Sequence, residues 1–233
     1  MTNEKTYENE TLDKSLALKE QARDMFALAM PHMQEFNKLM AYYRCAIMEI
    51  ETKFNVLNEE FSLQHDRNPI NGMTSRLKKF SSIVDKLERK NLPLTIENIE
   101  DTLNDIAGIR VVCAFPDDVY MLADAFLAQD DITLIRKKDY IANPKPNGYR
   151  SLHLIVSVPI FLAKEKRVMK AEIQIRTIAM DSWASLEHQL RYKKDFEFTE
   201  HMANELLYCA QLSAELDARM DALRDMVQDN HEI

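Results

Sequence analysis

Three polar side chains occupy alternate positions of one apolar segment. Over residues 169–177, Glu172, Gln174 and Arg176 alternate with aliphatic residues. Because successive side chains of a strand point to opposite faces of its sheet, we predict a strand with an acid, an amide and a guanidinium on one face. Such a face suits a functional surface. An ordinary solvent-exposed face is the alternative that this segment alone leaves open.

A histidine and an aspartate stand near two further predicted strands. His153 lies on one face of a strand predicted over 150–158, although a lone strand histidine is more often structural than catalytic. Asp105 comes shortly before a strand predicted over 109–115, where its carboxylate could bind a metal ion or cap a turn. The six histidines show no spacing typical of a zinc site.

Tyr149 follows a Pro-Asn-Gly turn, which holds its ring at the edge of a loop. Lys145 and Arg150 are its neighbours in the sequence. The ring could stack on a nucleobase while the two cations meet phosphate. It could equally be a turn tyrosine packed on the sheet.

Glycine content excludes several classes of phosphate-binding protein. Gly72, Gly108 and Gly148 are the only glycines, and they lie 36 and 40 residues apart. They cannot form a dinucleotide-binding motif, a Walker A motif or a hydrolase nucleophile motif. Any phosphate binding is therefore expected to depend on side-chain cations.

Composition predicts a globular protein of the cytoplasm. Hydrophobic residues make up 46% of the chain and charged residues 29%, which is ordinary for such proteins. No apolar run approaches the roughly 18 residues of a membrane span, and the polar, acidic first residues do not resemble a targeting segment. The three cysteines are far apart, which predicts buried free thiols in a reducing compartment.

Charge is unevenly spread along the chain, whose formal net charge is −8. Residues 67–194 carry 21 basic and 16 acidic residues, whereas residues 195–233 carry 2 basic and 10 acidic residues. Two windows, 76–90 and 136–150, concentrate the cations. This distribution favours a local anion site over general nucleic-acid binding. For either window alone, a solvated face explains the charge equally well.

Periodicity predicts an α+β fold, a small, mixed, mostly antiparallel sheet flanked by helices and extended by long N- and C-terminal helices. The expected helices cover residues 11–62, 74–90, 95–103, 117–128, about 178–190 and 200–227. The expected strands cover residues 109–115, 132–141, 150–158 and 167–177.

Four sequence blocks together resemble the synthetase domain of RelA/SpoT-type alarmone synthetases. They are SRLKKFSSIVDKLERK, NDIAGIRVVC, YIANPKPNGYRSLHLIV and EIQIRTIAMDSWASLEHQLRYK. The length of the chain is similar to that of the small, stand-alone RelQ-type (p)ppGpp synthetases. The resemblance implies an N-terminal helical extension over 1–64, a synthetase domain of nucleotidyltransferase-like fold over 65–194, and a C-terminal oligomerisation helix over 195–233.

The resemblance implies a pyrophosphate transfer. The family moves the β,γ-pyrophosphate of ATP to the 3′-hydroxyl of GDP or GTP and releases AMP. Asp105 and Glu172 match the positions that hold Mg²⁺, and Glu172 is also the candidate catalytic base. Positions matching the ATP site are Arg76, Lys78, Ser82, Lys86, Arg89 and Arg110. Positions matching the GDP/GTP site are Lys138, Lys145, Tyr149, His153 and Gln174.

Physical chemistry agrees with these implied roles. Phosphoryl-type transfer needs positioning and charge neutralisation more than covalent chemistry, and Mg²⁺ typically takes one or two carboxylates. Arginines also stack on adenine, so this site can work without a glycine-rich loop. Lys138 stands where relatives can have arginine, which keeps the charge and loses the fork-shaped contact.

The resemblance also implies a homotetramer assembled through the terminal helices, with single-stranded RNA as a possible regulator and no membrane partner. Gly72 stands where product-stimulated relatives carry an aromatic residue, which argues against activation by product. The sequence leaves the acceptor open among GDP, GTP and GMP.

Three other functions compete with synthesis. A binding module could hold guanine nucleotide or single-stranded RNA without turnover, but Asp105 and Glu172 argue for metal-dependent chemistry. A nucleotidyltransferase would typically show a Gly-Ser step and a D-x-D pair, which the chain lacks. A purely structural helical protein would have no need of the polar strand face.

Overall fold

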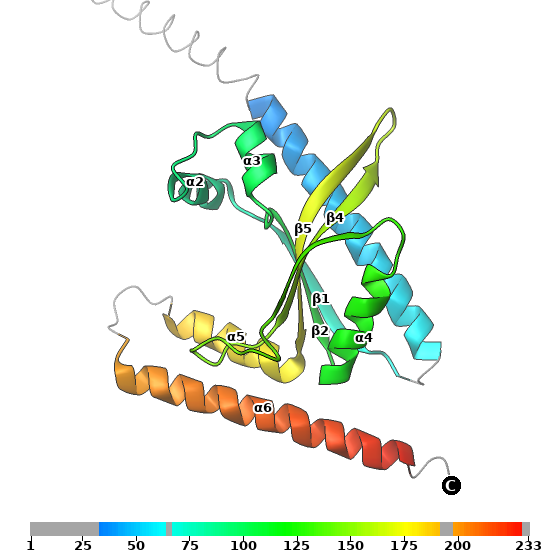
Figure 1. Ribbon diagram of the computed structural model, residues 1–233, viewed down its shortest axis with the longest axis vertical. Coiled ribbons are helices and arrows are strands. Elements are labelled where there is room, and N and C mark those ends of the chain that lie inside the picture. The colour runs from blue at the N-terminus through cyan, green and yellow to red at the C-terminus, as the bar shows by residue number, and fades with distance from the viewer. Residues whose placement is uncertain (1–32, 64–66, 192–197, 230–233) are drawn as a thin grey trace, which may run out of the picture. The chain divides into compact units, whose positions relative to one another are not determined.

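The computed structural model describes residues 33–63, 67–191 and 198–229 (Figure 1). The chain divides into two units, residues 1–41 and 42–233, and the fold below is that of the second. The described part of the N-terminal helix covers residues 33–63. The predicted helical residues 11–32 lie outside the described residues.

A five-stranded sheet forms the centre of the second unit. Its strands are β1 (Ile70–Leu77), β2 (Ala107–Cys113), β3 (Thr133–Asp139), β4 (Leu152–Phe161) and β5 (Lys166–Thr177). The strand order is β1-β2-β5-β4-β3, and only the β2–β5 pair is parallel. The predicted α+β class with a mostly antiparallel sheet is therefore confirmed.

Five further helices follow or interrupt the strands. They are α2 (Phe80–Glu88), α3 (Ile96–Thr102), α4 (Pro116–Leu127), α5 (Ile178–Arg191) and α6 (Glu200–Asp229). α5 and α6 pack side by side, and α4 contacts both β2 and β5 (Figure 1). Among the described residues, no helix combines the length and apolar character needed to cross a bilayer.

One face of the sheet is apolar and buried. In β2 and β5 every second residue is fully buried, as Ile109 and Ile173 illustrate. α4 contributes Phe126, whose ring stacks on Phe54 of the N-terminal helix with centroids 4.6 Å apart. Because the alternating residues of β2 and β5 are mostly polar or glycine, with Val112 and Val168 as the exceptions, burying this face leaves a polar opposite face for chemistry.

The helix predicted over 74–90 is wrong in its first half. Residues 70–77 form β1, and the helix α2 begins only at Phe80. β1 is an edge strand whose residues are mostly polar and half-buried or exposed. Its strand conformation depends on the ladder with β2 rather than on its own residues, so a sequence pattern could not reveal it.

The cysteines are free, but they are not uniformly buried. Cys113 is buried, Cys45 is partly exposed, and Cys209 is exposed on α6. The prediction of buried thiols is therefore right for Cys113 and wrong for Cys209, which lies on the outer side of a surface helix.

Candidate active site

Two rows of residues cross the polar face of the sheet. In the first row the strand register aligns Arg76, Gly108, Glu172, Ile155 and Arg136. In the second row it aligns Thr74, Arg110, Gln174, His153 and Lys138. Because directly paired residues share a face, strands far apart in sequence bring their polar side chains into one surface.

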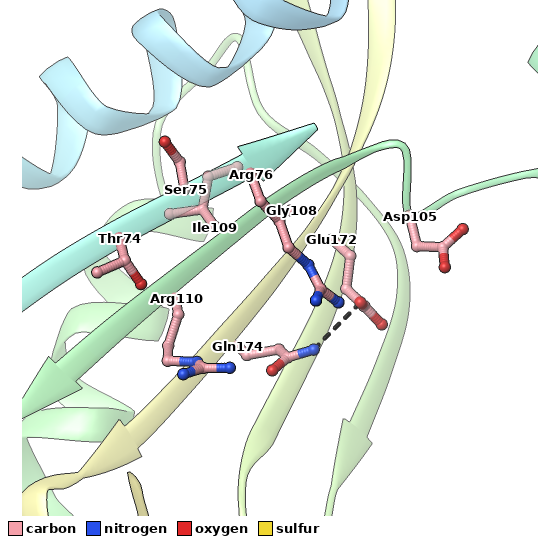
Figure 2. Close-up of a pocket in the computed structure, with 9 residues that line it drawn as sticks. All are labelled: Thr74, Ser75, Arg76, Asp105, Gly108, Ile109, Arg110, Glu172 and Gln174. Atoms are coloured by element: carbon pink, nitrogen blue, oxygen red, sulfur yellow. Dashed lines mark hydrogen bonds between the residues drawn. The ribbon is translucent and has the colours of Figure 1, made fainter. Parts of the chain in front are cut away.

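The parts of both rows that lie on β1, β2 and β5 line a pocket of about 200 Å³, which we call the arginine pocket. Figure 2 shows Arg110 at one end of the pocket and Asp105 at the other, with the side chains of Gln174, Arg76 and Glu172 between them. Gly108 forms part of its wall and leaves the space beside Arg76 open. The pocket therefore offers two guanidinium planes facing a carboxylate.

A second pocket, of about 210 Å³, lies on the other side of the carboxylates, and we call it the lysine pocket. Four cations line it: Lys86, Lys90, Arg136 and Lys138. Asp105, His153 and Glu172 also line it, together with Thr102 and Asn104. Asp105 and Glu172 are thus shared by both pockets, so molecules bound in the two pockets would meet at these carboxylates.

Asp105 is held by two lysines. Its Oδ2 lies 3.0 Å from Lys78 Nζ and 2.8 Å from Lys86 Nζ. Burial favours the neutral acid, but the hydrogen bonds from Lys86 and Lys78 outweigh it and lower the pKa of Asp105. Its other oxygen, Oδ1, is buried without a hydrogen-bond partner among the described residues.

Glu172 is also kept ionised by its neighbours. Gln174 Nε2 donates to its Oε2 at 3.2 Å, and His153 Nδ1 lies 3.5 Å from its Oε1. Burial acts to raise the pKa of Glu172, but the hydrogen bonds from His153 and Gln174 prevail and lower it. Both shared carboxylates are therefore negatively charged at neutral pH.

This pair of carboxylates fits a magnesium ion. Mg²⁺ typically binds one or two carboxylates and keeps several waters, and the unpartnered Oδ1 of Asp105 is free to accept such a ligand. Within the described residues, no group of three or more His, Cys, Asp or Glu is arranged to hold a metal ion. The two carboxylates alone supply oxygen ligands, the type that Mg²⁺ prefers.

A hydrogen-bonded chain leads from Glu172 to Tyr149. Arg176 Nη2 donates to the phenol oxygen of Tyr149 at 2.6 Å, and that oxygen lies 2.8 Å from His153 Nε2. The phenol oxygen accepts from Arg176, and its own O–H donates to Nε2 when the His153 proton is on Nδ1, facing Glu172. These contacts hold the Tyr149 ring in position.

Lys145 stands over two tyrosine rings. Its ammonium lies 4.7 Å from the ring centroids of both Tyr140 and Tyr149. The edge of one ring faces the other, with 6.0 Å between centroids. The loop before β4 thus presents an aromatic and cationic surface beside His153.

Most of the sequence-predicted residues come together around Asp105 and Glu172. The arginine pocket contains Arg76, Arg110 and Gln174, and the lysine pocket contains Lys86, Lys138 and His153. Lys78 joins through its ion pair with Asp105, whereas Lys145 and Tyr149 join beside His153. Ser82 and Arg89, both from the α2 region, line neither pocket.

Two neighbouring cations, Arg136 and Lys90, had no role in the sequence prediction. Arg136 alternates with Lys138 on β3, so strand periodicity could have found it. Lys90 follows α2 and had no such signal. Arg176 was predicted on the polar face of β5 with Glu172 and Gln174, as the structure has it. Arg150, which we considered as a phosphate ligand, binds Asp217 of α6 instead, with 3.1 Å between Nη1 and Oδ2.

Comparison with known proteins identifies relatives of this chain. A family profile described as "Region found in RelA / SpoT proteins" matches residues 75–197. GTP pyrophosphokinase YwaC of Bacillus subtilis is 42% identical over 185 residues, which are 79% of this chain and 88% of that protein.

Solved structures agree with the sequence relatives. Small alarmone synthetase 1 of Bacillus subtilis bound to its product pppGpp has a TM-score of 0.75 and 36% identity, covering 83% of this chain and 98% of that one. The same enzyme bound to AMPCPP has a TM-score of 0.70 and 33% identity, covering 84% of this chain and 99% of that one.

Proposed function

Because this chain belongs to the RelA/SpoT family, we propose that it is a small alarmone synthetase that makes (p)ppGpp. It transfers the β,γ-pyrophosphate of ATP to the 3′-hydroxyl of GDP or GTP and releases AMP. The observation that carries the proposal is the pair of carboxylates shared by two cation-lined pockets. A reaction that joins two polyanionic nucleotides needs two such pockets with a common centre.

ATP is assigned to the arginine pocket. Arg76 and Arg110 provide guanidinium planes that stack on adenine. Lys78 and Lys86, which both pair with Asp105, supply positive charge for the phosphates. Ser82 of α2 and Arg89, which follows this helix, remain candidate ATP ligands. To contact ATP in the arginine pocket, their side chains or the helix would have to move.

The guanine nucleotide is assigned to the lysine pocket and the aromatic loop. Tyr149 supplies the ring that stacks on guanine, and Lys145 and Lys138 supply positive charge. His153 and Gln174 lie between these groups and Glu172. The acceptor 3′-hydroxyl is thereby directed toward the shared carboxylates.

The reaction follows from this placement. The 3′-oxygen attacks the β-phosphorus of ATP, the bond from that phosphorus to the oxygen bridging to the α-phosphate breaks, and AMP leaves with this oxygen. Glu172, which is ionised, accepts the proton of the hydroxyl. Asp105 and Glu172 would hold Mg²⁺, which when bound neutralises charge on the transferred phosphates.

The finer partners belong to the same proposal. A homotetramer is supported by the apolar side chains that α6 exposes. Single-stranded RNA as a regulator is supported only by the exposed cations of β3, such as Lys137. A cytoplasmic location follows from the proposed substrates.

The test is product formation with a matched pair of variants. The purified chain is incubated with ATP, GDP and Mg²⁺, and the nucleotides are separated by anion-exchange chromatography. We expect AMP and a guanosine tetraphosphate in equal amounts, and a loss of about 10³-fold or more in rate for Glu172→Gln. Glu88→Gln, which changes an exposed carboxylate of α2, should keep the wild-type rate.

Two results would contradict the proposal. Nucleotide binding without AMP release by the wild type would make the chain a binding module. Equal rates for Glu172→Gln and the wild type would remove the strand carboxylate from the mechanism.

A further inference from the structure

Asp217 connects α6 to the residues just before β4 and at the end of β5. This aspartate is 5% exposed, and its Oδ2 accepts from Arg150 Nη1 at 3.1 Å and from Thr177 Oγ1 at 3.0 Å. Arg150 directly follows Tyr149, and Thr177 ends β5 and accepts from the backbone N–H of Met180 in α5. One buried carboxylate of α6 therefore joins the aromatic loop to the end of the catalytic strand.

Gly148 lies directly against α6. Its φ of +88° is a conformation that favours glycine, and a Cβ built there would lie 2.4 Å from Ala210 Cβ. The backbone of the loop thus packs directly on the side chains of Ala210 and Leu207, and no side chain of its own would fit there. A movement of this turn of α6 would displace Gly148 and, with it, the next residue, Tyr149.

Tyr149 is packed from the same side. It contacts a cluster formed by Trp183 and Ala184 of α5 and Ala210 of α6. Trp183 is tied to α6 through a hydrogen bond from its Nε1 to the carbonyl of Leu206 at 2.9 Å. The ring is therefore held at its hydroxyl by Arg176 and at its back by two helices.

We propose that Asp217 and Ala210 of α6 are positioning residues for the guanine-nucleotide site. They touch no substrate and act through Arg150, Gly148 and the packing behind Tyr149. The inference rests on the proposed function, because it takes the Tyr149 ring as the platform for guanine. It gives α6 a role in acceptor binding beside any role in assembly.

α6 has a second anchor that does not involve this loop. Arg224 donates to Asp117 at 3.2 Å and lies over the Phe115 ring at 5.1 Å. Burial raises the pKa of Asp217 against the opposing effects of Thr177 and Arg150, so an amide at this position relieves a cost of burying charge. We therefore expect Asp217→Asn to fold with α6 docked, which thermal unfolding would verify.

The only tryptophan of the chain provides the measurement. Trp183 fluorescence is titrated with GDP in the wild type, Asp217→Asn and Ala210→Val, and the steady-state KM for GDP and for ATP is measured for each. We expect GDP binding about tenfold weaker in both variants, a higher KM for GDP, and a KM for ATP within about twofold of the wild type. Glu215→Gln, an exposed change on the same helix, should match the wild type.

The outcomes separate this inference from the proposed function. If the wild type makes alarmone and both variants bind GDP as tightly as it does, the positioning role is wrong and the synthetase stands. Equal losses for ATP and GDP would indicate a general loss of structure and would also overturn it. Tyr149→Ala must weaken GDP binding; if it does not, or if the wild type binds no GDP, the guanine assignment and this inference fail together.

Discussion

At the residue scale, Asp105 is paired with two cations. Lys78 and Lys86 both contact its Oδ2 and neutralise the carboxylate. These ammonium groups are the ones that we propose for the ATP phosphates, and the carboxylate is the one that we propose for Mg²⁺. Binding of magnesium and ATP would therefore exchange partners among charges already present, without bringing a new unpaired charge into the site.

The ion pairs predict a specific dependence of stability on pH. The folded-state pKa values of Asp105 and Glu172 lie below their ordinary values of 3.8 and 4.5. Their contribution to stability is thus fully present above these ordinary values and is lost as the pH falls through the folded-state values. We expect the advantage of the wild type over Asp105→Asn/Glu172→Gln to be constant between about pH 7 and pH 5.5 and to shrink below about pH 4.5.

Urea unfolding of both proteins across this pH range measures the difference in free energy. Glu88→Gln serves as the control for a carboxylate exposed on α2. An advantage of the wild type that persists unchanged to the most acidic condition would show that the two carboxylates are not stabilised by their partners.

At the element scale, β2 contributes open space to the site, because its residue 108 is glycine and has no side chain. A Cβ at Gly108 would meet Arg76 Cγ at 3.6 Å, an ordinary contact, but larger branches would extend into the arginine pocket. We expect Gly108→Val to fold and to weaken binding of a non-hydrolysable ATP analogue about tenfold or more, with GDP binding within about twofold, by calorimetry.

Gly72 supplies the matched control. It is a strand glycine of the neighbouring β1, and a Cβ there would meet no atom within 4 Å. Gly72→Val should therefore bind both nucleotides like the wild type. If Gly108→Val and Gly72→Val change the affinity for the ATP analogue equally, the space beside Arg76 does not hold ATP.

Alternating residues made three of the strands predictable, and the strand predicted over 132–141 also matches β3 (Thr133–Asp139), although its residues are nearly all exposed. β2, β4 and β5 show buried residues at every second position, and the sequence placed each of them within about two residues of its start. β1 could not be found in this way, because its polar residues resemble an exposed helix face and only pairing with β2 defines it. The error mattered for the site, because it put Arg76 on a helix instead of the sheet.

At the scale of the whole molecule, the site required more than local patterns. The sequence could nominate Asp105 and Glu172 through a family resemblance, and the comparisons confirm that family. It could not show that two pockets share these carboxylates, since that depends on the strand order β1-β2-β5-β4-β3. Nor could it connect Arg150 with Asp217, which lie 67 residues apart.

The surface of the molecule carries a feature that suits assembly, an apolar side of α6. α6 exposes apolar side chains at steps of three or four residues, so they form one stripe along the helix. The exposed fractions are 47% for Leu212, 53% for Leu216, 47% for Met220, 53% for Leu223 and 57% for Val227. A continuous apolar stripe of this kind typically marks a protein–protein contact.

We expect light scattering after size exclusion to give about four times the chain mass of 27.2 kDa for the wild type. Leu216→Glu/Leu223→Glu should reduce it to a single chain, because glutamates on the stripe would be buried without partners. Ala218→Glu, an exposed position on a different side of α6, should leave the assembly intact. Because the stripe and the buried Asp217 lie on different sides of the helix, the monomeric variant should still bind GDP with wild-type affinity. If the wild type elutes as a single chain, or if the variant with both glutamates still assembles, the apolar stripe is not the assembly surface.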